Sequence, residues 1–237
     1  MTTDSSNLIG LRLTTNPVSA MWQVPAATAE FTVVLIGWVM REAPLDAGVP
    51  KEAAQILSEW LTRLAVVTFL HSPPESKTAS PNRWSEVDGG WITVLTRPGI
   101  GFGQHPPFPL LSTRDLKIAQ LLFSAEPFDW SQQGQVALLT EGGQPPPTVN
   151  YDVVEKCFHR QSLADIFRLP ELRLLGLIYP AVDGDFAALI SANPEFIALA
   201  LQDLSGACDA AKLSFTMTSE EEFRSTTWTG QVSLRDQ

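Results

Sequence analysis

The chain has 237 residues, of which 44% are hydrophobic and 18% charged, and its formal net charge is −10. This balance is typical of a folded globular protein and argues against extended disorder. Lysines and arginines number only 16 and form no run, so nucleic acid and anionic membrane surfaces are not expected partners. The acidic charge is compatible with a basic protein partner.

The two cysteines and the hydrophobic runs indicate the compartment. Cys157 and Cys208 lie far apart and form no disulfide framework, so we expect small buried apolar residues in a reducing environment. The first residues do not resemble a secretory signal. The most apolar run, 31–40, has about half the roughly 20 residues that a membrane span needs. We therefore expect a cytoplasmic protein without membrane insertion.

The N-terminal part predicts two strands and a helix. Residues 8–14 predict a strand with Arg12 facing outward. Residues 31–40 are apolar on both faces, which favours a central strand. Pro50 suits the first turn of a helix that we expect to end before Pro73. The apolar stripe of this helix, at three- and four-residue spacing, consists of Ala53, Ile56, Leu57, Trp60, Leu64 and Val67.

A loop and a hairpin follow. The composition of 71–83 predicts a loop, and it is the best candidate for a weak internal boundary in what we expect to be one globular domain over 1–237. Residues 84–96 predict a hairpin, because Asp88-Gly89 is a preferred pair for a tight turn.

Glycine and proline dominate 98–109, which excludes regular structure there. Three of its glycines resemble a phosphate loop, but no helix follows directly and no Lys-Ser/Thr pair is present. A surface loop is the favoured interpretation, and a loop of this length can also bind a ligand. Ser112 and Asp115 then resemble a capping pair at the start of a helix.

The C-terminal part alternates helices and strands without a repeat or a steady βαβ rhythm. This mixture predicts an α+β fold with a mostly antiparallel sheet and helices packed on it. The expected elements are a strand over 135–140, a helix over 151–169 broken near Ser162, an inner strand over 172–179, a turn at 183–185 leading into an Asp-capped helix, a helix capped by Asn193, a strand over 212–218, a capped turn at 219–222 and a strand over 227–234.

Few residues are candidates for catalysis. Of the three histidines, only His159 has a candidate partner, Glu155, four residues earlier on the same helical face. The pair could act as an acid–base couple or as two metal ligands, or it could be an ordinary surface pair. Asp183 and Asp185 could hold a hard cation, but two carboxylates are too few by themselves. We therefore expect no metal and no cofactor.

The region between Arg173 and Lys212 contains no lysine, arginine or histidine, so its carboxylates cannot form salt bridges within this region. They are solvated, neutralised from elsewhere in the fold, or directed at a partner. The functional interpretation is that Asp203 and Asp209, with Asp183, border an apolar patch that binds a basic protein. Separately, Trp84 and Trp130 lie beside loops, where an exposed tryptophan would be a contact residue.

Two classes of function remain open at this level. The first is a non-catalytic protein of the accessory, adaptor or inhibitor type that binds another protein. The second is a hydrolase-like enzyme whose site is assembled from distant residues around His159, Glu155, Asp183 and Asp185. The absence of a coherent catalytic motif favours the first, although many active sites have no local signature.

Overall fold

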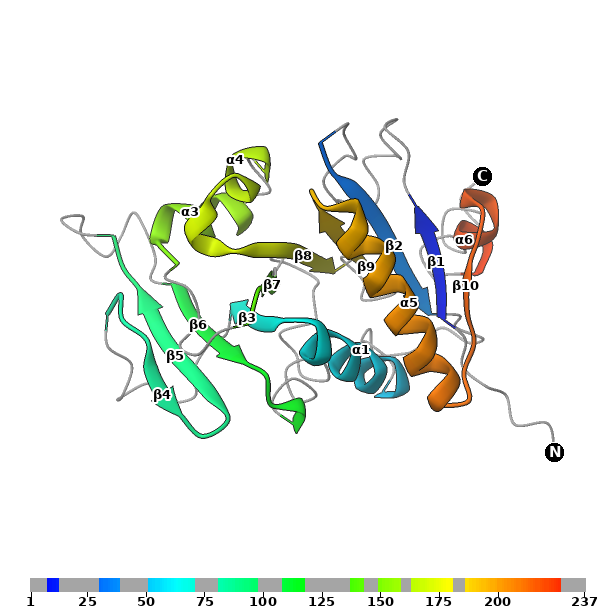
Figure 1. Ribbon diagram of the computed structural model, residues 1–237, viewed down its shortest axis with the longest axis horizontal. Coiled ribbons are helices and arrows are strands. Elements are labelled where there is room, and N and C mark those ends of the chain that lie inside the picture. Colours follow the sequence, from blue (N-terminus) through cyan, green and yellow to red (C-terminus); the bar gives the residue numbers. More distant parts are fainter. Residues whose placement is uncertain are drawn as a thin grey trace, which may run out of the picture.

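The computed structural model describes residues 8–12, 30–38, 51–70, 81–97, 108–117, 137–142, 149–158, 163–180 and 186–226. Within these ranges the chain forms a ten-stranded sheet and five α-helices, shown in Figure 1. Neighbouring strands run antiparallel throughout the sheet, except for one parallel pair at its edge. The predicted α+β class with a mostly antiparallel sheet is confirmed.

The elements alternate along the chain. The strands are β1 Leu8–Arg12, β2 Thr32–Trp38, β3 Val66–Leu70, β4 Ser85–Val87, β5 Gly90–Leu95, β6 Phe108–Thr113, β7 Ala137–Thr140, β8 Leu174–Pro180, β9 Phe186–Ser191 and β10 Phe215–Met217. The helices are α1 Lys51–Leu64, α3 Tyr151–Phe158, α4 Leu163–Phe167, α5 Pro194–Ala210 and α6 Glu220–Thr226, with a short 3₁₀ helix at Pro170–Leu172. Across the sheet the order is β10-β1-β2-β9-β8-β7-β3-β6-β5-β4.

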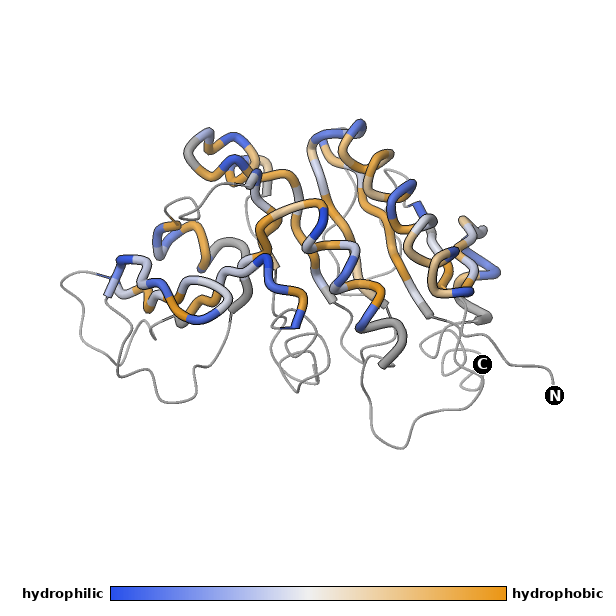
Figure 2. The backbone as a smooth tube through the Cα atoms, turned by 60° about the horizontal axis from the view of Figure 1, so that its bottom comes forward, coloured by the Kyte–Doolittle hydropathy of each residue, from blue (hydrophilic) through white to orange (hydrophobic). Residues whose placement is uncertain are grey.

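The strands β2 and β9 pair antiparallel inside the sheet, with Leu35 opposite Ala188. Apolar residues on both faces of these strands are buried, which explains why alternation of polar and apolar residues is missing from their sequences. In Figure 2 the strands in the middle of the sheet are mostly orange, whereas hydrophilic residues mark the turns.

One face of the sheet is covered by α1 and α5, which pack against each other (Figure 1). Trp60 of α1 and Leu204 of α5 are fully buried in this first core. The strands contribute every second residue to it, as the pleat of a sheet requires. Those strand residues are Leu8, Val34, Ile36, Val67, Leu111, Ala137, Leu139, Ile178, Ala187 and Leu189.

The opposite face carries a second core, to which α3, α4 and α6 contribute. Tyr151 and Val154 of α3, Ile166 of α4 and Phe223 of α6 are buried in it. Phe223 is fully buried, and its helix contacts β1. The sheet therefore lies between two helical layers, and most of its apolar surface is removed from water.

Among the described elements, the same succession of two strands, a helix and a strand occurs twice. It comprises β1, β2, α1 and β3 in the first half, and β8, β9, α5 and β10 in the second. The strands β2 and β9 pair antiparallel and α1 packs on α5, so the two units contact each other through these elements. In the sheet, the final strand of each unit lies near the first strand of the other unit. β10 pairs directly with β1, and only β7 lies between β3 and β8.

Several predicted elements are confirmed. The central strand is β2, the outward Arg12 of β1 is exposed, and the hairpin turn at Asp88-Gly89 uses a positive φ of 77° at Gly89. The strands predicted over 135–140 and 172–179 correspond to β7 and β8, and the described parts of the helix predicted over 151–169 are α3 and α4. The break predicted near Ser162 lies outside the described residues. The strand predicted over 227–234 lies outside the described residues.

The predicted first helix is too long. It ends at Leu64, and Val67 belongs to β3 instead of the helical stripe. The run Val66-Val67-Thr68 is β-branched, and β3 pairs with both β6 and β7, so sheet pairing prevails over helical spacing there.

The segment after Asp185 was also predicted wrongly. A strand, β9, takes the place of the expected Asp-capped helix, because its buried alanines and leucine fit between β2 and β8. The predicted irregular loop 98–109 likewise ends in β6, which begins at Phe108. Ser112 lies in that strand and accepts a hydrogen bond from Thr68 Oγ1 at 2.9 Å, so it caps no helix.

The extent of the domain stays a prediction. Strands from either side of 71–83 belong to the same sheet, and residues 71–80 lie outside the described part of the chain.

Candidate functional site

The structure places few of the predicted catalytic residues. His159, Asp183, Asp185 and Trp130 lie outside the described residues, so their grouping stays a prediction. Glu155 lies on α3, partly buried, one turn after Tyr151. Burial first, and then the Glu155 carboxylate, raise the pKa of Tyr151. Among the described residues no three histidine, cysteine, aspartate or glutamate side chains are close enough to hold a metal ion.

Two other candidates are explained by packing. Trp84 is half-buried against the second core just before β4, so most of its ring is not available to a partner. Cys208 is fully buried in α5, as expected, and burial followed by the neighbouring Asp209 carboxylate raises the pKa of its thiol to about 11. A thiol with this pKa is protonated near neutral pH, which disfavours nucleophilic catalysis.

One side of α5 is exposed to solvent. Asn193 fixes the start of this helix, because its Oδ1 accepts hydrogen bonds from the backbone N–H groups of Glu195 at 2.9 Å and Phe196 at 3.2 Å. With Phe196, Ala200 and Leu204 buried, the opposite side faces solvent. We call this side the outer line; it consists of Glu195, Leu199, Gln202, Gly206 and Asp209, all exposed.

Leu199 is the most exposed large hydrophobic side chain among the described residues, with 61% of its surface accessible. Leu116 and Met217, the other exposed large hydrophobic residues there, have 37% and 43%. Single exposed hydrophobic residues are common, but an exposed leucine between carboxylates differs from a solvated charged helix face. Glu195 and Asp203 lie one turn before and one turn after it.

The carboxylate of Asp203 is neutralised from elsewhere in the fold. Its Oδ2 lies 3.6 Å from an amino group of Arg63 on α1, and the two side chains are 37% and 52% exposed. This Oδ2 atom is itself buried and has no hydrogen bond among the described residues. Asp203 therefore belongs to the contact between α1 and α5 and borders the outer line instead of lying on it.

Asp209 has a different environment. It is exposed in the last turn of α5, a helix with no basic residue in that turn. No described residue forms an ion pair with it, and the nearest basic residue along the chain is Lys212. A carboxylate at this end of a helix is disfavoured by the helix dipole.

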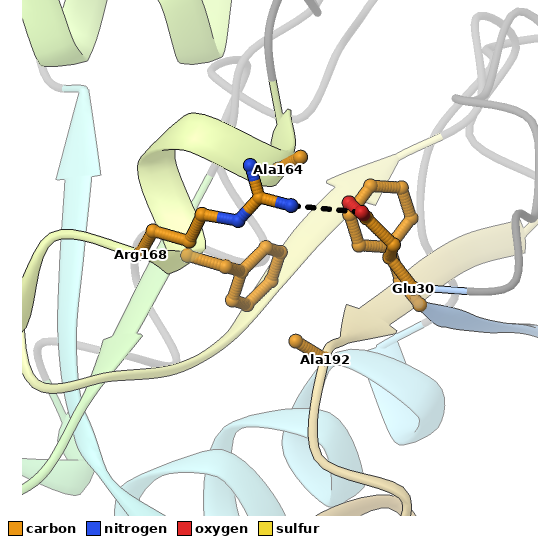
Figure 3. Close-up of a pocket in the computed structure, with 6 residues that line it drawn as sticks. Glu30, Ala164, Arg168 and Ala192 are labelled. Atoms are coloured by element: carbon orange, nitrogen blue, oxygen red, sulfur yellow. Dashed lines mark hydrogen bonds and ion pairs between the residues drawn. The ribbon is translucent and has the colours of Figure 1, made fainter.

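A small hollow lies at the end of β9, beside α4 (Figure 3). It has a volume of about 310 Å³ and is lined by Glu30, Phe31, Ala164, Phe167, Arg168 and Ala192. The Phe31 and Phe167 rings lie 5.9 Å apart, and Arg168 donates to a Glu30 carboxylate oxygen at 2.8 Å across the opening. The hollow is mainly apolar with a neutral ion pair at its rim, so it offers no net charge to a ligand.

A second hollow, of about 540 Å³, lies between the end of β5 and the start of α3. Arg97 and Asp152 face each other in it at 3.6 Å, and Asn82 and Thr96 hydrogen-bond each other through side chain and backbone. The positive and negative groups of this hollow are thus paired. Within the described lining of either hollow there is no histidine or cysteine.

No model of a known protein family matches the chain, and comparisons with curated proteins and with solved structures find no similar protein. No described helix is long and apolar enough to cross a membrane.

Sequence reasoning pointed to Asp203 and Asp209 but missed Leu199. Leu199 lies at helical spacing from residues of the buried face, so the sequence alone is compatible with its burial. Only the rotation of α5 about its own axis, relative to the sheet, shows that Leu199 faces water.

Proposed function

We propose that this protein binds another protein without catalysing a reaction, in the manner of an accessory, adaptor or inhibitor protein, and that the outer line of α5 is the contact surface. The observation that supports it is the 61% exposure of Leu199 between carboxylates on a well-anchored helix. A rigid helix presents such a side chain at little entropic cost, and an apolar centre with a charged rim is the usual composition of a protein interface.

The carboxylates support the same proposal. With a net charge of −10, the protein repels acidic partners and attracts basic ones over distances of about a Debye length. Asp209 has no described ion-pair partner, so its charge is available at the rim. Rim charges mainly accelerate association and make it sensitive to salt.

Affinity capture from the native host tests the proposal. The original chain and two variants, Leu199→Ser and Leu116→Ser, are compared by quantitative mass spectrometry. We expect at least one protein to be retained by the original chain and by Leu116→Ser, and lost with Leu199→Ser. Leu116 is the matched control because it is also an exposed leucine but lies outside α5. Equal retention by all three, or retention of nothing above background, would contradict the proposal.

A further inference from the structure

We infer that the partner places a basic helix lengthwise along the outer line of α5; this rests on the proposed function and specifies the chemistry of its partner. The residues of the outer line follow one another at intervals of four, three, four and three positions. This is the spacing of a heptad seam, which stays in line along a helix and suits a second helix packed beside it. From Glu195 to Asp209 the line extends for about 21 Å at 1.5 Å per residue.

Gly206 supports close approach of a partner along this line. A Cβ atom added there would have no neighbour within 4 Å, and its backbone lacks the positive φ that would call for glycine. Glycine is less favourable than alanine inside a helix, and no contact within the described fold explains its presence. An absent side chain on an exposed helix face allows a second helix to approach closely, and Ala198 and Ser205 beside the line are also small.

Asp209 supports a partner of positive charge. It stands where the helix dipole disfavours a carboxylate, and α5 contains no lysine, arginine or histidine. Glu195 places a second carboxylate at the other end of the line. Three residues of the outer line are locally unfavourable: exposed Leu199, the helical glycine Gly206, and Asp209 in the last turn. Departures of this kind are expected where a surface serves a partner.

A second copy of the chain does not fit the same surface. Antiparallel apposition of two outer lines would place Glu195 of one copy opposite Asp209 of the other, and parallel apposition would place Asp209 opposite Asp209. Both arrangements bring like charges together, which disfavours association. A helix with lysine or arginine on its contact face satisfies the charges at both ends.

Site-specific photocrosslinking tests this inference in the full chain. A benzophenone amino acid replaces Gln202, at the centre of the outer line, and replaces Glu86, on the far edge strand β4, as control. The crosslinked segment of the host protein is sequenced by mass spectrometry. The Gln202 chain is then examined in two further backgrounds, Gly206→Ala and Asp209→Lys. Both changes favour the helix and are expected to raise the melting temperature, so loss of crosslinking in them is not loss of folding.

We expect the Gln202 crosslink to map to a segment with lysine or arginine recurring at helical spacing. The yield of this crosslink should fall by about threefold or more in each of the two backgrounds, although the melting temperature of the protein rises in both. A segment without basic residues, or a yield unchanged in both backgrounds, would overturn the basic helix while leaving protein binding through Leu199 in place. A yield at Gln202 no greater than at Glu86 would overturn both.

Discussion

The indole N–H of Trp60 donates a hydrogen bond of 2.7 Å to the backbone carbonyl of Ala200, which is 140 residues away in the chain. The tryptophan is fully buried, and the bond joins α1 to α5 inside the first core. It fixes the rotation of α5 about its own axis, because the acceptor lies on the buried side of that helix. The exposure of Leu199, one residue earlier, follows from the same rotation.

Replacing Trp60 by alanine should therefore be strongly destabilising. We expect Trp60→Ala to lower the free energy of unfolding by about 3–5 kcal/mol, since it removes a buried indole and leaves a cavity. Trp60→Phe keeps most of the buried ring but not the hydrogen bond, and should cost less. Urea unfolding of both variants measures this. A loss below about 1 kcal/mol for Trp60→Ala would contradict the described packing of α1 on α5.

Two glycine-to-alanine changes should act in opposite directions. A Cβ at Gly90 would collide with the backbone carbonyl oxygen of Ser112 in the neighbouring strand β6, which cannot move without breaking the sheet. We expect Gly90→Ala to destabilise the protein by about 1–3 kcal/mol. Gly206→Ala meets open space and should stabilise it by about 0.5–1 kcal/mol. Thermal unfolding of the pair checks both signs, and destabilisation by Gly206→Ala would mean that its side of α5 is covered.

Cys208 should be inert in the folded protein. In a Cys157→Ser background, we expect a thiol reagent at pH 8 to modify Cys208 only after denaturant is added, because the thiol is fully buried and protonated. Rapid modification without denaturant would show that α5 opens readily.

The raised pKa of Cys208 also predicts a pH dependence. The thiol pKa in the fold is about 11, against an ordinary value of 9.0, so folding favours the protonated form. The associated stability is complete below pH 9 and is lost as the pH rises from 9 towards 11. Comparing Cys208→Ala with its parent between pH 8 and pH 11, both in the Cys157→Ser background, isolates this contribution. A parallel decline of the two would contradict it.

Substitutions at Asp203 and Asp209 should have different effects, the first on stability and the second on the rate of association. Asp203→Asn is expected to lower the stability by less than about 1 kcal/mol, since its ion pair with Arg63 is partly exposed. Asp209→Asn should leave the melting temperature unchanged or raise it, and should slow association with the captured partner at ~20 mM salt, where the Debye length is about 20 Å. Stopped-flow rates at low and high salt measure the second effect, with Glu86→Gln as control. Unchanged association at low salt would exclude Asp209 from the interface.

Local signals were sufficient for much of the fold. The Asp88-Gly89 turn, the Asn193 cap and the double-sided apolar run of β2 each have a short-range physical cause, and each was predicted from its own residues. The errors concern segments whose structure depends on distant partners. Val67 lies in β3, which pairs with β6 and β7, and Phe186 lies in β9, which pairs with β2. Each of these partner strands is far away along the chain.

The candidate surface was predicted in part. The absence of basic residues from 174–211 is visible in the sequence and drew attention to Asp203 and Asp209. The sequence could not separate their roles, because Arg63, which neutralises Asp203, comes from another helix. Leu199 was missed for a related reason: its exposure depends on how α5 rests on the sheet and on α1.

The pairing of β10 with β1 has a consequence for folding during synthesis on the ribosome. Strand β1 lies between β2 and β10, and the backbone N–H of Thr218 bonds to the carbonyl of Gly10 at 2.7 Å, across 208 residues of chain. Strand β1 must therefore remain unpaired on that edge until the 208 residues that separate Gly10 from Thr218 have been synthesised. The described sheet can be completed only after β10 has been made, so its assembly should be slow and the nascent chain should depend on protection of that edge.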